Sequence, residues 1–102
     1  TIPHVFLRKL EAMLETKNQR LRIAACAVLG RAVEKNPEKW IHILLIALED
    51  EDPDIRLEVC EILKMLKDNV AYVEVINRLL MVLSDKDLQV RLAAFRAIAE
   101  ID

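Results

Sequence analysis

The chain has 102 residues, of which 54% are hydrophobic, 31% charged and only 4% aromatic, with one glycine and three prolines. This composition leaves little of the β-branched and aromatic alternation that strands favour, and it is rich in good helix formers, so it predicts a single all-α domain. A net charge of −2 gives no overall attraction to nucleic acid or to anionic lipid.

Apolar residues at helical spacing predict six helices separated by short polar turns. The dipeptide Asn36-Pro37 ends the second helix, because proline disfavours the α conformation in the residue before it, and Pro37 opens the third. Pro53 opens the fourth helix in the same way, with Asp52 as its N-cap. The predicted helices span residues 1–15, 19–35, 38–49, 53–67, 72–83 and 87–101.

The apolar stripes of these helices predict the core. On the last helix, Phe95 and Ile98 are expected on the core face with nothing downstream to cover them, so that face calls for a further repeat or a partner. The stripe of the second helix is expected to contain Leu21, Ile23, Ala25, Cys26, Val28, Leu29 and Val33.

The longest apolar run, residues 43–48, is far shorter than a membrane span, and no signal peptide is recognisable. The sequence has no initiating methionine and both ends look cut rather than capped. We therefore expect a fragment of a longer protein.

One pattern occurs three times along the chain. A leucine ends an apolar run, a polar turn follows, and an arginine stands eight positions after the leucine: Leu14 to Arg22, Leu48 to Arg56 and Leu83 to Arg91. Self-similarity at this period is typical of a stacked solenoid, in which no single unit can bury its own apolar face. The predicted repeats are residues 1–36, 37–69 and 70–102.

Two of the repeats also carry an aspartate six positions before the arginine, at Asp50 and Asp85. In this respect nearly the whole chain resembles the HEAT repeat family. The resemblance implies a right-handed α–α superhelix of three two-helix HEAT-like repeats, part of a longer solenoid. It also implies a ladder of hydrogen bonds between adjacent turns. Its residues would be Asp50, Arg56, Asp85 and Arg91, with Arg22 as the first rung.

The first repeat departs from the family pattern, because Thr16 stands where an aspartate is expected. The period is also shorter than in typical HEAT or armadillo units and close to that of tetratricopeptide and ankyrin units. The sequence lacks the aromatic pattern of tetratricopeptide repeats and the Thr-Pro-Leu-His of ankyrin repeats. It also has no room for the third helix that each armadillo unit needs. Short HEAT-like repeats of two helices remain.

Cys26 and Cys60 occupy the same repeat position, four residues after the arginine. We interpret them as small core residues rather than as a disulfide or half a metal site, because equivalent positions on stacked helices lie too far apart for easy bridging. Unpaired cysteines favour a reducing compartment, and we expect a cytoplasmic protein.

No arrangement of residues supports catalysis, a metal or a cofactor. His4 and His42 have no carboxylate at the spacing of a helical metal site, and Ser84 lies in a turn without the glycines of a nucleophile elbow. Gly30 alone cannot form a phosphate loop, and its simpler role is close helix packing. The acidic residues 50–54 lack the spacing of a calcium loop and form a solvated turn.

The second helices of a solenoid present an exposed stripe to partners, here at two, five, nine and twelve positions after each arginine. Its acidic centre would suit an extended or helical basic peptide, although the same residues also fit an ordinary solvated face. We assign partner contact to Arg31, Glu58, Glu61, Met65, Asp68 and Arg96, with Ala24, Ala27, Glu34, Ala93 and Glu100 completing the stripe. On the opposite side, Ile43, Ile46 and Met81 form either an interface or ordinary packing.

These features favour a non-catalytic scaffold for protein–protein interaction, with a protein or peptide partner and with self-association through the last helix as a further option. The alternatives are a nucleic-acid-binding HEAT-like module and a regulatory subunit of a lyase or modifying enzyme. Nucleic acid is disfavoured because only Arg31 and Arg96 on the stripe suit phosphates, while Glu58, Glu61 and Asp68 oppose them. An enzyme of this type would need a Glu/His cluster or an added domain.

Overall fold

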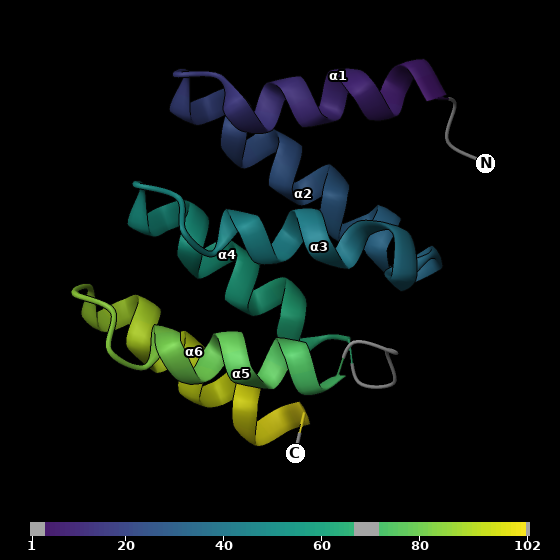
Figure 1. Ribbon diagram of the computed structural model, residues 1–102. Helices are drawn as coiled ribbons and strands as arrows, with labels where there is room; N and C mark the ends of the chain where they lie inside the picture. The colour runs from purple at the N-terminus through teal and green to yellow at the C-terminus, as the bar shows by residue number, and fades with distance from the viewer. Residues whose placement is uncertain (1–3, 67–71, 102) are drawn as a thin grey trace.

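The computed structural model describes residues 4–66 and 72–101, and within them the chain forms six α-helices joined by short turns (Figure 1). The helices form where apolar spacing and the prolines predict them, and α2 has the predicted bounds. Helix α3 begins one residue earlier than expected, at Pro37, and ends two earlier, at Ala47. The helices are α1 (His4–Glu15), α2 (Gln19–Lys35), α3 (Pro37–Ala47), α4 (Pro53–Lys64), α5 (Tyr72–Val82) and α6 (Leu88–Ile101).

The helices form two layers, α1, α3 and α5 in one and α2, α4 and α6 in the other, with α1 and α6 at opposite ends of the stack (Figure 1). The second layer carries the inter-repeat packing, because α4 is in close contact with both α2 and α6. Across the described residues, neither the α1–α3 nor the α3–α5 pair is packed as closely. The first layer is therefore more open than the second.

The core runs through all three repeats without a break. Leu29, Leu44, Leu63 and Leu79 are each 0% exposed, although they come from four different helices. No repeat encloses these side chains alone, so stacking of neighbours supplies the hydrophobic stabilisation, as in other solenoids.

Both cysteines are buried and unpaired, as the sequence predicts. Burial, followed by the charges of Asp50 and Glu58, raises the pKa of the Cys26 thiol to about 11. Burial, followed by the charges of Asp85 and Glu61, raises the pKa of Cys60 to about 12.

Two residues of the predicted core stripe of α2 are exposed instead, Leu21 at 43% and Val28 at 37%. Their counterparts in the next repeat, Ile55 and Ile62, are buried because α2 packs against α4. Within the described structure no second helix precedes α2, so this side of it remains open. The sequence prediction was wrong because it applied the pattern of an internal repeat to the first one.

The exposed stripe of α6 also needs a correction at Ala93, which was predicted to face a partner and is 1% exposed. Helix α6 packs against α4 more closely than α2 does, and a small residue permits such an approach. Phe95 is 62% exposed, so it lies uncovered as the sequence indicated, whereas the equivalent Cys26 and Cys60 are fully buried.

Candidate functional site

The turns within the three repeats share one local hydrogen bond, which fixes the start of each second helix. The Asp50 carboxylate accepts from the backbone N–H of Asp52 at 2.9 Å, and the Asp85 carboxylate accepts from that of Asp87 at 2.9 Å. Thr16 makes the same contact with its hydroxyl, which accepts from the N–H of Asn18 at 3.3 Å. Thr16 thus replaces the turn-forming role of the aspartate but not its charge.

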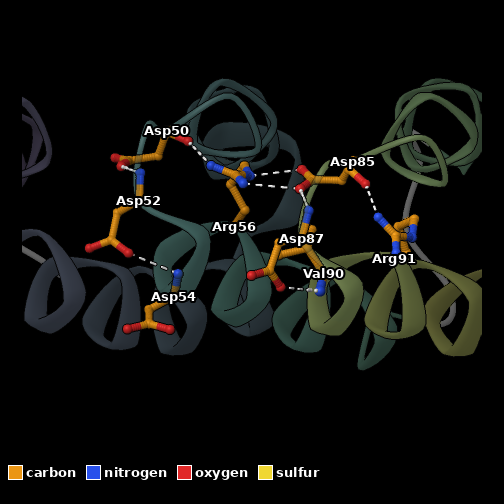
Figure 2. Close-up of polar contacts among 8 residues, drawn as sticks. All are labelled: Asp50, Asp52, Asp54, Arg56, Asp85, Asp87, Val90 and Arg91. Atoms are coloured by element: carbon orange, nitrogen blue, oxygen red, sulfur yellow. Dashed lines mark hydrogen bonds and ion pairs between the residues drawn. The ribbon is translucent and has the colours of Figure 1, made fainter.

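The residue whose backbone N–H donates each of these bonds also caps the following helix with its side chain. The side chain of Asn18 accepts from the N–H of Leu21 at 3.2 Å, and that of Asp52 accepts from the N–H of Asp54 at 2.9 Å. Asp87 accepts from the N–H of Val90 at 3.1 Å (Figure 2). These caps satisfy backbone donors that would otherwise be unpaired at a helix N-terminus.

Arg56 connects the second repeat to the third, as Figure 2 shows. Its Nη1 donates to the carbonyl oxygen of Asp50 in its own turn at 2.7 Å. Its Nε and Nη2 donate to the two carboxylate oxygens of Asp85 in the next turn, at 2.8 and 3.0 Å. This bidentate, charge-assisted pair fixes both the distance and the orientation of the two turns.

Arg22 connects the first repeat to the second from the equivalent position, but with fewer hydrogen bonds. Its Nη1 donates to the carbonyl oxygen of Thr16 at 2.8 Å, and its Nε lies 3.2 Å from Asp50 Oδ2. The latter is an ion pair rather than a hydrogen bond, since the buried Nε has no partner at hydrogen-bonding geometry. Glu51 adds a distant contact at 3.9 Å.

Arg91 repeats the intra-turn half of this arrangement, donating from Nη1 to the carbonyl oxygen of Asp85 at 2.6 Å. No carboxylate among the described residues pairs with its remaining nitrogens. The structure therefore brings the five residues of the predicted ladder into one row along the turns, with Arg91 as its last member.

The electrostatics of the row are strongest at the Arg56–Asp85 pair, whose side chains are 8% and 11% exposed. The hydrogen bond with Asp85 raises the pKa of Arg56, against the opposing effect of burial. For Asp85, burial alone would raise the pKa, but the bond from Arg56, the backbone N–H of Asp87 and the Arg56 charge lower it overall. Both groups are therefore held in their charged forms.

A groove lies between α2 and α4 on the face formed by the second helices, with a volume of about 260 Å³. It combines an apolar floor with charged rims. A Cβ added at Gly30 would lie 3.1 Å from the side chain of Ile62, so glycine allows the two helices to approach and keeps the floor low. The groove is lined by Ala27, Gly30, Arg31, Glu34, Glu58, Ile62 and Met65.

Three of the residues predicted to contact a partner, Arg31, Glu58 and Met65, line this groove. Met65 is 62% exposed, so it adds accessible apolar surface to the lining of the groove. Glu61 lies on the same helix and pairs with Lys64 at 3.2 Å. Arg96 is exposed on α6 outside the groove, and Asp68 lies outside the described residues.

A second groove lies between α1 and α3 in the other layer, with a volume of about 160 Å³. Ile43 and Ile46 of the predicted apolar patch both line it, whereas Met81 lies apart on α5 and is 72% exposed. The groove is lined by Glu11, Leu14, Glu15, Ile43, Ile46 and Ala47.

One inter-repeat contact was missed in the sequence. Arg78 of α5 donates to the carbonyl oxygen of Leu45 at 3.1 Å and to the Glu49 carboxylate at 3.3 Å, which connects α5 to α3. His42 of α3 and Glu74 of α5 lie 3.8 Å apart beside it. The available signal was an arginine at a position where the preceding repeat has the apolar residue Ile43.

Other kinds of site find no support in the described part of the chain. Residues 4–66 and 72–101 contain no group of three or more His, Cys, Asp and Glu side chains that could hold a metal ion. None of the helices described is long and apolar enough to span a bilayer.

The sequence model of a family described as HEAT repeats matches residues 7–99, which is nearly the whole chain. A comparison with curated proteins gives no match.

Proposed function

The chain belongs to the HEAT repeat family, whose members are generally protein-interaction scaffolds, and we propose that it is a non-catalytic scaffold whose α2–α4 groove binds a basic peptide segment. The observation that carries this proposal is the groove itself. It joins a large exposed methionine to acidic side chains on a face held in register by Arg22 and Arg56.

The groove fits a segment with one apolar side chain between basic residues. The apolar side chain would lie over Gly30 and against Met65, where burial removes apolar surface from water. The basic residues would pair with Glu58 and Glu34 at the rims and with the nearby Glu61. Repeat 37–69 carries nine acidic and four basic residues, so the same charge would also speed association. Arg31 would select against a partner with a second positive charge at its end of the groove.

Peptide display on the folded chain tests this proposal. We expect selected peptides to carry lysine or arginine on both sides of an apolar residue, and to bind the Glu58→Lys/Glu61→Lys variant at least tenfold more weakly. A matched control, Glu38→Lys/Glu74→Lys, reverses two exposed glutamates of the other layer and should leave binding unchanged. Selected peptides without a basic bias, or equal loss in both variants, would contradict the proposal.

Nucleic-acid binding is the less favoured function. Arg31 stands beside Glu34 and Glu58 in the groove, so a phosphate there would meet more negative than positive charge.

We place the scaffold in the cytoplasm, because two buried, unpaired cysteines suit a reducing compartment.

We further propose that the exposed Phe95 permits self-association through the last helix. Sedimentation equilibrium tests this directly. If Phe95 lies in the contact, the parent chain should associate with increasing concentration and the Phe95→Glu variant should stay monomeric. Two monomeric chains would exclude self-association.

A further inference from the structure

In the first helical layer, the contact between α1 and α3 and the contact between α3 and α5 are lined by different side chains, although equivalent helices of consecutive repeats form both. Between α3 and α5, Arg78 extends from α5 and donates to the carbonyl oxygen of Leu45 and to the carboxylate of Glu49. A cation thus fills the gap and satisfies an acidic side chain and a backbone acceptor of the preceding repeat.

The equivalent positions between α1 and α3 can be read from the spacing of the arginines, 34 residues between the first two repeats and 35 between the second and third. Glu15 corresponds to Glu49, and Glu11 corresponds to Leu45. Ile43 stands where the next repeat has Arg78. The acidic residue is therefore retained in the first gap, but the arginine that would neutralise it is absent.

The structure shows the consequence. The first gap is a groove lined by Glu11, Glu15 and four apolar residues. Both glutamates are exposed, and neither forms an ion pair with any residue among those described. Ile46 is 67% exposed at the edge of the same groove, so apolar surface and unpaired negative charge lie side by side.

We propose that this α1–α3 groove is a docking site for a helical segment of a partner protein, which inserts an arginine where the chain lacks its own counterpart of Arg78. The guanidinium donates to the Glu15 carboxylate and to the carbonyl oxygen of Glu11. Arginine suits this position better than lysine because its planar fork reaches both acceptors at once, whereas lysine acts as a point charge.

Apolar residues one turn away from that arginine cover Leu14 and Ile46, as an amphipathic helix does when it enters a groove. This surface lies in the layer opposite the α2–α4 groove, so the chain presents two separate surfaces. The partners of the two grooves differ. The α1–α3 groove requires a single arginine on an apolar helix, whereas the α2–α4 groove requires basic residues around one apolar side chain.

Two fluorescein-labelled peptides test the proposal with the full chain. Both are amphipathic helices of about 18 residues, long enough to form helix on binding, with leucines at helical spacing. They differ only at one central position, arginine in one and glutamine in the other. Fluorescence anisotropy should give about tenfold tighter binding of the arginine peptide, because only that peptide forms charge-assisted hydrogen bonds.

Variants of the protein locate the effect. Glu15→Gln should bind both peptides equally, while Glu49→Gln, the same change at the position already paired with Arg78, should keep the preference. The variant Ile43→Arg supplies the missing cation internally. It should lose most of its binding to the arginine peptide while its melting temperature stays at or above that of the parent.

Three results would overturn the proposal. The first is equal affinity of the parent for the two peptides, and the second is an unchanged preference in Glu15→Gln. The third is loss of the preference in Glu58→Lys/Glu61→Lys, because the peptide would then occupy the α2–α4 groove.

Discussion

Replacing Arg56 by alanine removes the strongest contact between the second and third repeats. The change deletes three hydrogen bonds, two to the Asp85 carboxylate and one to the Asp50 carbonyl oxygen. It also leaves the Asp85 side chain, 11% exposed, without its cation. Removing one partner of a buried pair costs about 3–5 kcal/mol, which is a large share of the roughly 5–15 kcal/mol that stabilises a domain of this size.

Urea unfolding followed by circular dichroism measures this cost. With a typical urea dependence of about 1.5–2 kcal/mol per molar, the midpoint of Arg56→Ala should fall by about 2 M. The control is Lys64→Ala, since Lys64 is half-exposed and makes a single surface pair with Glu61, worth about 0.5 kcal/mol.

A second comparison separates the free energy of the lost ion pair from the cost of leaving the Asp85 carboxylate unpaired. Arg56→Ala/Asp85→Asn should be less destabilised than the sum of its two single variants, because the carboxylate left without a partner is gone. Equal midpoints for Arg56→Ala and Lys64→Ala would refute the role assigned to the ladder.

Three further predictions concern pH, thiol reactivity and the core. Because the pKa of Asp85 is lower in the folded chain than its usual value of 3.8, its contribution to stability is present above about pH 5 and is lost as pH falls through the lowered pKa. The urea midpoint should therefore fall less between pH 6 and pH 3 in Asp85→Asn than in the parent. Cys26 and Cys60, with pKa values raised to about 11 and 12, should react with Ellman's reagent at pH 8 only after unfolding, and rapid reaction of the native chain would contradict their burial. Leu44→Ala should cost about 2–5 kcal/mol in urea unfolding because Leu44 is fully buried, whereas Met81→Ala, at a side chain that is 72% exposed, should change stability by less than about 0.5 kcal/mol.

The helices could be predicted from the sequence because their signals are local. Pro53 starts α4 at the expected residue, Pro37 starts α3 one residue before the expected bound, and the side chain of Asp52 caps α4 as its position indicated. The period of the repeats also predicted the all-α solenoid, since a fixed period places equivalent helices beside one another.

Burial at the ends of the stack could not be predicted in the same way. Leu21 has the same pattern as Ile55, yet only Ile55 has a preceding second helix to cover it. Ala93 has the same register as Glu58, but the closer approach of α6 to α4 buries it. Periodicity identifies a face of a helix, and the neighbours of that helix decide whether the face is covered.

The grooves depended on contacts that a periodic pattern does not contain. Arg31, Glu58 and Met65 were predicted on one exposed stripe and Gly30 at a close helix contact, but the spacing did not predict that Gly30 and Ile62 line the same groove. The bridge from Arg78 to Glu49 was missed because the second repeat has Ile43 at the position of Arg78, so the arginine does not recur with the repeat.

The most direct test of the proposed function is a ¹H–¹⁵N correlation titration of the chain with a peptide obtained from the display experiment. Binding in the α2–α4 groove predicts the largest shifts at the amides of Gly30, Arg31, Glu58 and Met65, and small shifts along α1 and α5. Shifts confined to α1, α3 or the open face of α6 would contradict it.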